Sequence, residues 1–296
     1  MTHVSVRQGL LYISLAATAW GTGGAAGALL DRAGGVGPVA VSFWRFAVGA
    51  TMILLVTRIL GVAIPRHSAL GRAVVLGVAM AVCQTAYFAA IAESGLAVAT
   101  VVTTGATPVF VAAGSAVLLR ERPGAAGLGC VAAALAGLAL LASDDGPAGF
   151  SPAGAGWALL SAAGYAGVTL LNRARPAEPY STAMGGFAVG AACLLPVALA
   201  HGMLPSGEQL ASWALIAYLG AIPTALAYGL FFAGLAAVRA MTASVITLVE
   251  PVGAAALGVL LFGERLSPQA AGGAALLLAA VVLLALGERK EAPNPA

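Results

Sequence analysis

Long apolar runs, separated by short polar stretches, repeat along the whole 296-residue chain. Each run approaches the roughly 20 residues that an α-helix needs to cross the hydrocarbon layer of a bilayer. The runs predict ten spans, at residues 9–30, 38–58, 69–92, 96–119, 125–142, 153–172, 180–201, 210–236, 240–262 and 268–286. The pattern is typical of an all-α integral membrane protein with short connections.

The runs of the second half repeat those of the first. The segment TGATPVFVAAGSAVLLRER, at 104–122, aligns with TLVEPVGAAALGVLLFGER, at 247–265, and places Pro108 on Pro251. The sequence Phe-Ala-Val-Gly-Ala also occurs twice, at 46–50 and at 187–191. Two copies of a five-helix unit are the simplest explanation.

We therefore expect a first repeat at 1–143, a second repeat at 153–287 and a cytoplasmic tail at 288–296. Acidic residues, glycine and proline gather at 143–152, which predicts a loop between the repeats. The polar, proline-containing tail is predicted to be disordered.

Composition and charge place the chain in a membrane and orient it. Hydrophobic residues make up 60% of the sequence and charged residues 8%, against about a quarter charged in soluble domains. Basic residues near span ends favour the cytoplasmic side. If the amino terminus is cytoplasmic, only two basic residues in the loops, Arg32 and Arg265, lie outside the cell. Both termini are thus predicted to lie on the cytoplasmic side of the membrane. The net charge of +3 is too small to indicate a nucleic-acid surface.

An odd number of helices in each repeat would turn the second copy upside down in the membrane. The groups Glu121-Arg122 and Glu264-Arg265 should then face opposite sides. Inverted repeats place a substrate path near the bilayer midplane and favour alternating access of that path to either side. The topology thus indicates a secondary transporter of a small molecule. No phosphate-binding GxxxxGK[ST] motif occurs, so nothing indicates transport driven by ATP.

Ionisable residues within spans are costly and mark candidate functional positions. Arg45 has two interpretations: structural pairing near the membrane interface, with Glu93 as a partner, or contact with the substrate. Glu250 lies mid-span, where burial of its charge suits a group that couples transport to protons. Alternatively, Glu250 bonds to backbone groups that Pro251 frees by removing an amide donor. Pro108 and Pro251 are candidate helix-breaking or gating positions.

Aromatic residues gather where the repeats match, at Trp20, Tyr87, Phe88, Tyr165, Tyr228, Phe231 and Phe232. Such rings carry a polar group and suit a pocket for amphipathic molecules, although lipid-facing placement is common. We favour the pocket for Tyr165 and Tyr228, whereas both placements remain open for Trp20.

Catalytic and metal sites are not indicated. No histidine lies deep enough in a span to activate Ser94 or Ser115, and no HExxH motif or aspartate pair is present. The three cysteines lie in apolar runs without ligand spacing. An intramembrane enzyme is therefore disfavoured, and no cofactor is expected.

The chain resembles the ten-helix EamA-type exporters of the drug/metabolite transporter superfamily. The resemblance rests on Trp20-Gly21, Arg45-Phe46, Pro108 with Glu121-Arg122, and Glu250-Pro251 with Gly263-Glu264-Arg265. It implies two inverted five-helix repeats around a central cavity and the export of amino acids, aromatic ones included, or of related metabolites and drugs. Facilitated transport without protons, and import of another metabolite, remain alternatives. By position, the resemblance implies substrate contacts at Trp20, Tyr87, Thr104, Tyr165, Tyr228 and Glu250.

Overall fold

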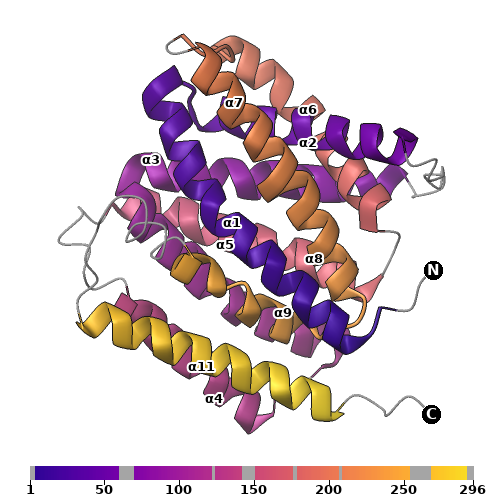
Figure 1. Cartoon of the computed structure of the whole chain (residues 1–296), viewed down its shortest axis with the longest axis vertical. Helices are drawn as coiled ribbons and strands as arrows, with labels where there is room; N and C mark the ends of the chain where they lie inside the picture. The colour runs from indigo at the N-terminus through magenta and orange to yellow at the C-terminus, as the bar shows by residue number, and fades with distance from the viewer. Residues whose placement is uncertain are drawn as a thin grey trace.

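A computed structural model describes residues 4–59, 70–121, 124–141, 151–175, 179–206, 209–253 and 268–291. These residues form a helical bundle (Figure 1). Its first half contains α1 (Val6–Gly34), α2 (Pro38–Ile59), α3 (Leu70–Gly114), the π-helical turn η1 (Ser115–Leu119) and α4 (Ala125–Leu141). Its second half contains α5 (Pro152–Ala174), α6 (Pro179–His201), α7 (Gln209–Gly220), η3 (Ala221–Leu226), α8 (Ala227–Leu235), α9 (Ala240–Ile246) and α11 (Pro268–Glu291).

Most helix ends lie within a few residues of the predicted span ends, and the end of the tenth span differs most. The tenth span continues as α11 to Glu291, so its helix takes in residues 288–291 of the predicted disordered tail. The start of α5 is fixed locally, because Ser151 accepts a hydrogen bond from the Gly154 amide at 3.2 Å and Pro152 follows as the first helical residue. Most of the predicted loop at 143–152, and the Glu264-Arg265 group, lie outside the described residues.

Helix α3 contains the third and fourth predicted spans, and its first limb runs antiparallel to α5. At the start of α3, Arg72 donates a hydrogen bond to Asn172 near the end of α5, at 2.8 Å. At the other end of this limb, Ser94 leaves no room for a Cβ on Gly154, near the start of α5. The limb from 70 to 94 therefore spans the length of α5 in the opposite direction.

The second limb of α3 runs parallel to α5. Thr103 donates to the carbonyl oxygen of Ala158 at 3.3 Å, and further along Gly114 packs against Leu170. The hydroxyls of Tyr87 and Thr100 are 2.8 Å apart, although a straight helix would separate residues thirteen apart by about 20 Å. The chain therefore reverses direction near residues 94–100, and α3 crosses the bundle twice.

The two halves run through the bundle in opposite directions. Helix α1 packs antiparallel to α7 and α8, with Gly9 against Gly234 at one end and Gly34 against Ser212 at the other. We call the end that contains the start of α1 the terminal face, because Figure 1 shows both chain termini on that side. Helix α1 leaves the terminal face, whereas its counterpart α5 arrives there. The inverted arrangement of two repeats is thus confirmed.

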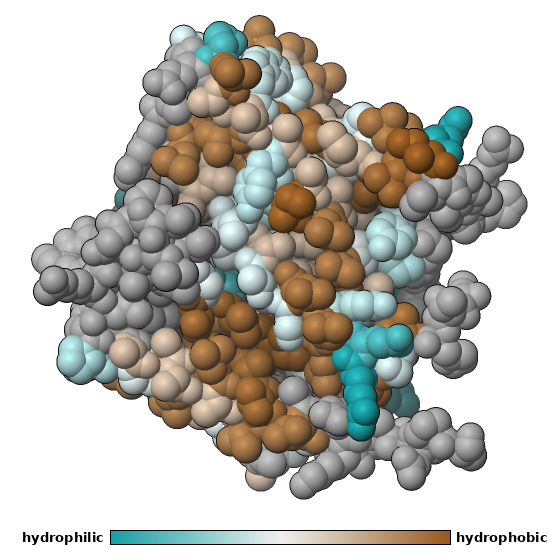
Figure 2. All heavy atoms as spheres, viewed as in Figure 1, coloured by the Kyte–Doolittle hydropathy of each residue, from teal (hydrophilic) through white to brown (hydrophobic). Residues whose placement is uncertain are grey.

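The outer surface of the bundle suits a lipid environment. Six described segments are long and apolar enough to cross a membrane by themselves: 38–59, 71–94, 102–119, 152–174, 179–201 and 209–235. Large apolar side chains such as Leu11, Leu55 and Val117 point outward. Figure 2 shows hydrophobic residues over much of the described surface, with polar ones mainly at the edges. The chain is therefore a multi-pass membrane protein.

Candidate functional site

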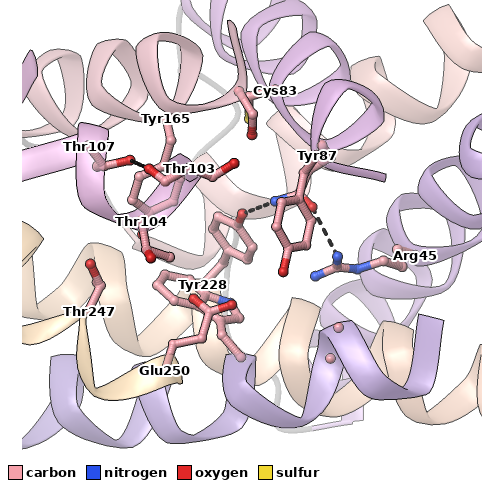
Figure 3. A pocket seen from close by; sticks show the side chains of 15 residues that line it. Arg45, Cys83, Tyr87, Thr103, Thr104, Thr107, Tyr165, Tyr228, Thr247 and Glu250 are labelled. Carbon is pink, nitrogen blue, oxygen red and sulfur yellow. Dashed lines mark hydrogen bonds between the residues drawn. The ribbon is translucent and has the colours of Figure 1, made fainter. Parts of the chain in front are cut away.

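A central cavity lies between the two halves, and about 640 Å³ of atom-free space, open solvent included, lies within it and at its mouth. Both halves contribute to its wall (Figure 3). The lining side chains and glycines are Trp20, Gly23, Gly24, Arg45, Cys83, Gln84, Tyr87, Thr103, Thr104, Thr107, Ser161, Tyr165, Tyr228, Thr247 and Glu250. All six residues for which the sequence predicts substrate contact lie in this wall.

The cavity wall follows the internal repeat. Residues at matching positions of the two copies line the cavity in four pairs, which are Trp20 with Tyr165, Tyr87 with Tyr228, Thr104 with Thr247, and Thr107 with Glu250. The first three pairs are of similar chemical character. The fourth pair differs, because Thr107 carries a hydroxyl where Glu250 carries a carboxylate. The wall is therefore nearly symmetric in its rings and hydroxyls, whereas its charge is not.

Four packed aromatic rings, three of which line the cavity, form a cluster that we call the aromatic floor. Trp20 occupies their centre, with ring centroids 4.9 Å from Tyr228, 5.1 Å from Phe231 and 5.8 Å from Tyr165. Tyr228 and Phe231 are almost completely buried. Tilted and edge-to-face packing at these distances is favourable. The floor joins α1 of the first half to α5 and α8 of the second.

Arg45 enters the cavity wall from α2, and two of its nitrogens belong to a polar network. Its Nη1 donates to Gln84 Oε1 at 2.9 Å, and its Nε donates to Thr224 Oγ1 at 3.1 Å. Its guanidinium carbon also lies 5.5 Å from the centre of the Phe88 ring, a cation–π distance. Glu93, the predicted partner, is exposed, and among the described residues Arg45 bonds to Gln84 and Thr224 instead.

Glu250 points into the cavity from the segment after α9 (Figure 3). Its backbone amide donates to the Thr247 carbonyl at 2.9 Å, which is the carbonyl that Pro251, four residues later, cannot bond. The backbone therefore compensates for the proline. No hydrogen bond or ion pair to the Glu250 carboxylate is found within the part of the chain that the structure describes.

The two prolines at matching positions of the repeat, Pro108 and Pro251, affect their helices differently. Pro108 lies inside α3, which continues as a helix through it to Gly114. Before Pro251, the helix is interrupted by a turn at Thr247 and Leu248, where α9 ends and a second helical stretch begins. Thr247 and Glu250 line the cavity at this break, whereas Thr104 and Thr107 line it from the continuous helix α3. A gating role for either proline remains a prediction.

The whole chain matches one family of membrane proteins. Residues 7–143 and 152–286 each match the EamA-like transporter family. The chain belongs to the EamA-like transporter family. Membership identifies a transporter rather than an enzyme, as the missing catalytic motifs suggested.

Individual relatives agree with this EamA assignment over nearly their full length. The uncharacterized transporter YwfM of Bacillus subtilis is 31% identical over 287 residues, which cover 95% of each chain. The uncharacterized inner membrane transporter YicL of Salmonella typhimurium is 25% identical and covers 97% of this chain and 98% of its own. A solved crystal structure superposes with a TM-score of 0.80 at 22% identity, over 96% of this chain and 99% of its own. At that identity it supports the EamA fold alone.

Gln84 is the main cavity residue of this EamA protein that sequence reasoning missed. Its amide links Arg45 to Tyr228, because its Nε2 donates to the Tyr228 hydroxyl at 2.6 Å. One signal was present, since Gln84 is the one amide side chain well inside a predicted span. Such polar groups in spans tend to face a cavity or a partner.

Metal chemistry finds no support at this EamA site. In the described ranges, no group of three or more histidine, cysteine or acidic side chains could hold a metal ion. Cys83 lines the cavity, but its thiol donates to the Met80 carbonyl within the same helix at 3.4 Å. What the cavity offers is therefore a guanidinium, a carboxylate, hydroxyls, an amide and aromatic rings.

Proposed function

We propose that this transporter exports amino acids, with aromatic amino acids as the first candidates, by alternating access of the central cavity. One observation carries the proposal: the same aromatic-lined cavity holds one guanidinium, of Arg45, and one carboxylate, of Glu250. A free amino acid presents the complementary groups, a carboxylate, an ammonium and a side chain. The cavity therefore matches a zwitterion better than a solute with a single charge.

Arg45 is the proposed partner of the amino-acid carboxylate. Two of its N–H groups bond to Gln84 and Thr224, and a guanidinium has five such donors. The remaining donors suit a carboxylate, which guanidinium groups bind through paired hydrogen bonds. The network leaves the guanidinium oriented before the solute arrives, which reduces the entropy lost on binding.

Glu250 is the proposed partner of the ammonium group and the proposed site of proton coupling. An ionised carboxylate would hold the ammonium, whereas a protonated one would release it. Proton and solute would therefore compete for Glu250, and inward proton movement would be exchanged for outward movement of the amino acid. A mid-span carboxylate without a protein partner among the described residues is suited to this exchange because burial disfavours its charge.

The proposed orientation places the terminal face in the cytoplasm of a bacterial cell, with the protein in the inner membrane. The described arginine side chains outside the cavity support it, because they all lie toward the terminal face: Arg7, Arg58, Arg72, Arg120, Arg173, Arg175 and Arg239. Basic residues near span ends favour the cytoplasmic side.

Solute counterflow in proteoliposomes tests the proposal. Labelled amino acids are screened with and without a pH gradient, and each transported one is repeated with Glu250→Gln. We expect transport that depends on the gradient in the wild type and loses that dependence in the variant. Transport that ignores the gradient in both proteins would indicate a facilitator and remove the coupling role of Glu250. Transport of drugs or other metabolites alone would contradict the amino-acid proposal.

A further inference from the structure

A hydrogen-bonded chain runs from Arg45 through Gln84 to Tyr228, and its direction is fixed by chemistry. A guanidinium can only donate hydrogen bonds, so the atom of Gln84 that faces Arg45 Nη1 at 2.9 Å is the amide oxygen. The amide nitrogen therefore faces Tyr228 and donates to its hydroxyl at 2.6 Å. Tyr228 accepts this bond, which leaves its own O–H hydrogen to be donated elsewhere.

The aromatic floor consequently offers donors without acceptors. No acceptor for the Tyr228 hydrogen is found among the described residues. Trp20 Nε1 and Tyr165 Oη are also buried without a hydrogen-bond partner in the described part of the chain. Buried polar groups are normally paired, and each unpaired one costs free energy. Three donors from α1, α5 and α8 thus border one cavity and lack acceptors.

We propose that Gln84 fixes the direction of this chain and thereby makes Arg45 and the neighbouring donors of the floor one subsite for the carboxylate of the solute. Gln84 is then a specificity-determining residue that acts by orienting Arg45 and Tyr228. The inference rests on the proposed function, because it assumes a solute that carries a carboxylate. The subsite selects oxygen acceptors, and it disfavours the amine that remains when the carboxylate is removed from the same amino acid.

Two substitutions at Gln84 separate direction from charge. In Gln84→Glu, the new carboxylate accepts from both Arg45 and Tyr228, so the Tyr228 hydroxyl turns its lone pairs toward the cavity. In Gln84→Leu, the chain is broken without any added charge, so the Tyr228 hydroxyl loses its donor and Arg45 keeps only its bond to Thr224. The matched control is Gln209→Glu, the same change at the first residue of α7, where Gln209 bonds only to the Pro205 carbonyl in the described structure.

The experiment measures competition against labelled phenylalanine in counterflow, using unlabelled phenylalanine and phenethylamine, and leucine and isopentylamine as a second pair. Thermal stabilisation of the purified protein by each compound gives a readout of binding that does not require transport. We expect the wild type and Gln209→Glu to prefer each amino acid over its amine by at least about tenfold, the effect of one hydrogen bond to a charged group. Gln84→Glu should reverse the preference, and Gln84→Leu should reduce it to within roughly threefold.

The outcomes distinguish a failure of the carboxylate subsite from a failure of the proposed function. If Gln84→Leu keeps the preference of the wild type while Gln84→Glu loses it, added charge alone explains the effect and the inference is overturned. If both variants keep the preference, the inference is overturned as well, and the proposed function survives. If the wild type binds neither amino acid, the proposed function fails and the carboxylate subsite fails with it.

Discussion

The contact between the two halves at Gly77 gives a prediction that can be worked out from geometry. Gly77 lies on α3, where it faces α6 of the second half. A Cβ at this position would lie 2.6 Å from the Cβ of Val189 and 2.8 Å from the carbonyl oxygen of Gly186, whereas ordinary contacts begin near 3.4 Å. Because a carbonyl oxygen belongs to the backbone, α3 and α6 would have to move apart to accept alanine.

The expected cost of Gly77→Ala follows from two opposing effects. Overpacking of this kind costs about 1–3 kcal/mol, and three close contacts, one of them to backbone, place Gly77→Ala at about the upper end of that range. Alanine also stabilises a helix over glycine by about 0.5–1 kcal/mol. The net expectation is a loss of roughly 2–2.5 kcal/mol. Gly71→Ala is the matched control, since it lies on the same helix with nothing within 4 Å of the added Cβ.

Thermal unfolding of both variants in detergent tests this expectation. The variants should differ by about 2–3 kcal/mol, which corresponds to a lower unfolding temperature for Gly77→Ala by about 5 °C or more. Equal unfolding temperatures for Gly77→Ala and Gly71→Ala would refute the close approach of α3 and α6. Because unfolding of membrane proteins is often irreversible, both are compared at one heating rate.

Two further predictions concern the network and the topology. Arg45→Lys should reduce amino-acid counterflow at least about tenfold, because one ammonium cannot replace the two N–H groups that reach Gln84 and Thr224. The control Arg58→Lys, at the exposed end of α2, should leave counterflow unchanged. Equal activity of the two variants would argue against the Arg45 network. Single cysteines introduced as Gly202→Cys and Arg175→Cys should react with membrane-impermeant reagents from opposite sides of the membrane, with position 202 reacting from outside the cell. Reaction of both cysteines from the same side would contradict the inverted topology.

The helical architecture could be predicted from the sequence because its causes are local. Apolar length decides which segments cross the membrane, and the duplicated segments around Pro108 and Pro251 reveal the repeat without any knowledge of contacts. An odd number of spans per copy then requires inversion. The cavity residues on the repeat, such as Tyr87 and Tyr228, were predictable for the same reason, since matching positions of inverted copies approach one axis.

The polar network could not be predicted, because it depends on contacts between distant parts of the chain. Arg45 and Thr224 are separated by 179 residues, and Gln84 and Tyr228 by 144. Nothing in the sequence near Arg45 indicates that its partners are an amide and a hydroxyl rather than Glu93. The end of α11 was also misjudged, because the polar character of residues 288–291 favours solvent but does not prevent a helix from continuing.

The cavity combines a symmetric shape with asymmetric charge, and the combination bears on how the transporter works. Where the first half has Arg45 and Thr107, the second has Gly186 and Glu250 at the matching positions. Under the proposed function, matching rings and hydroxyls would allow either half to close the cavity in a similar way, so neither face would need a gate of its own chemistry. The unequal charges would bind a zwitterion in one orientation, with its carboxylate toward Arg45 on α2 and its ammonium toward Glu250 in the segment after α9. We propose that the repeat underlies alternating access and that the departures from it underlie selectivity.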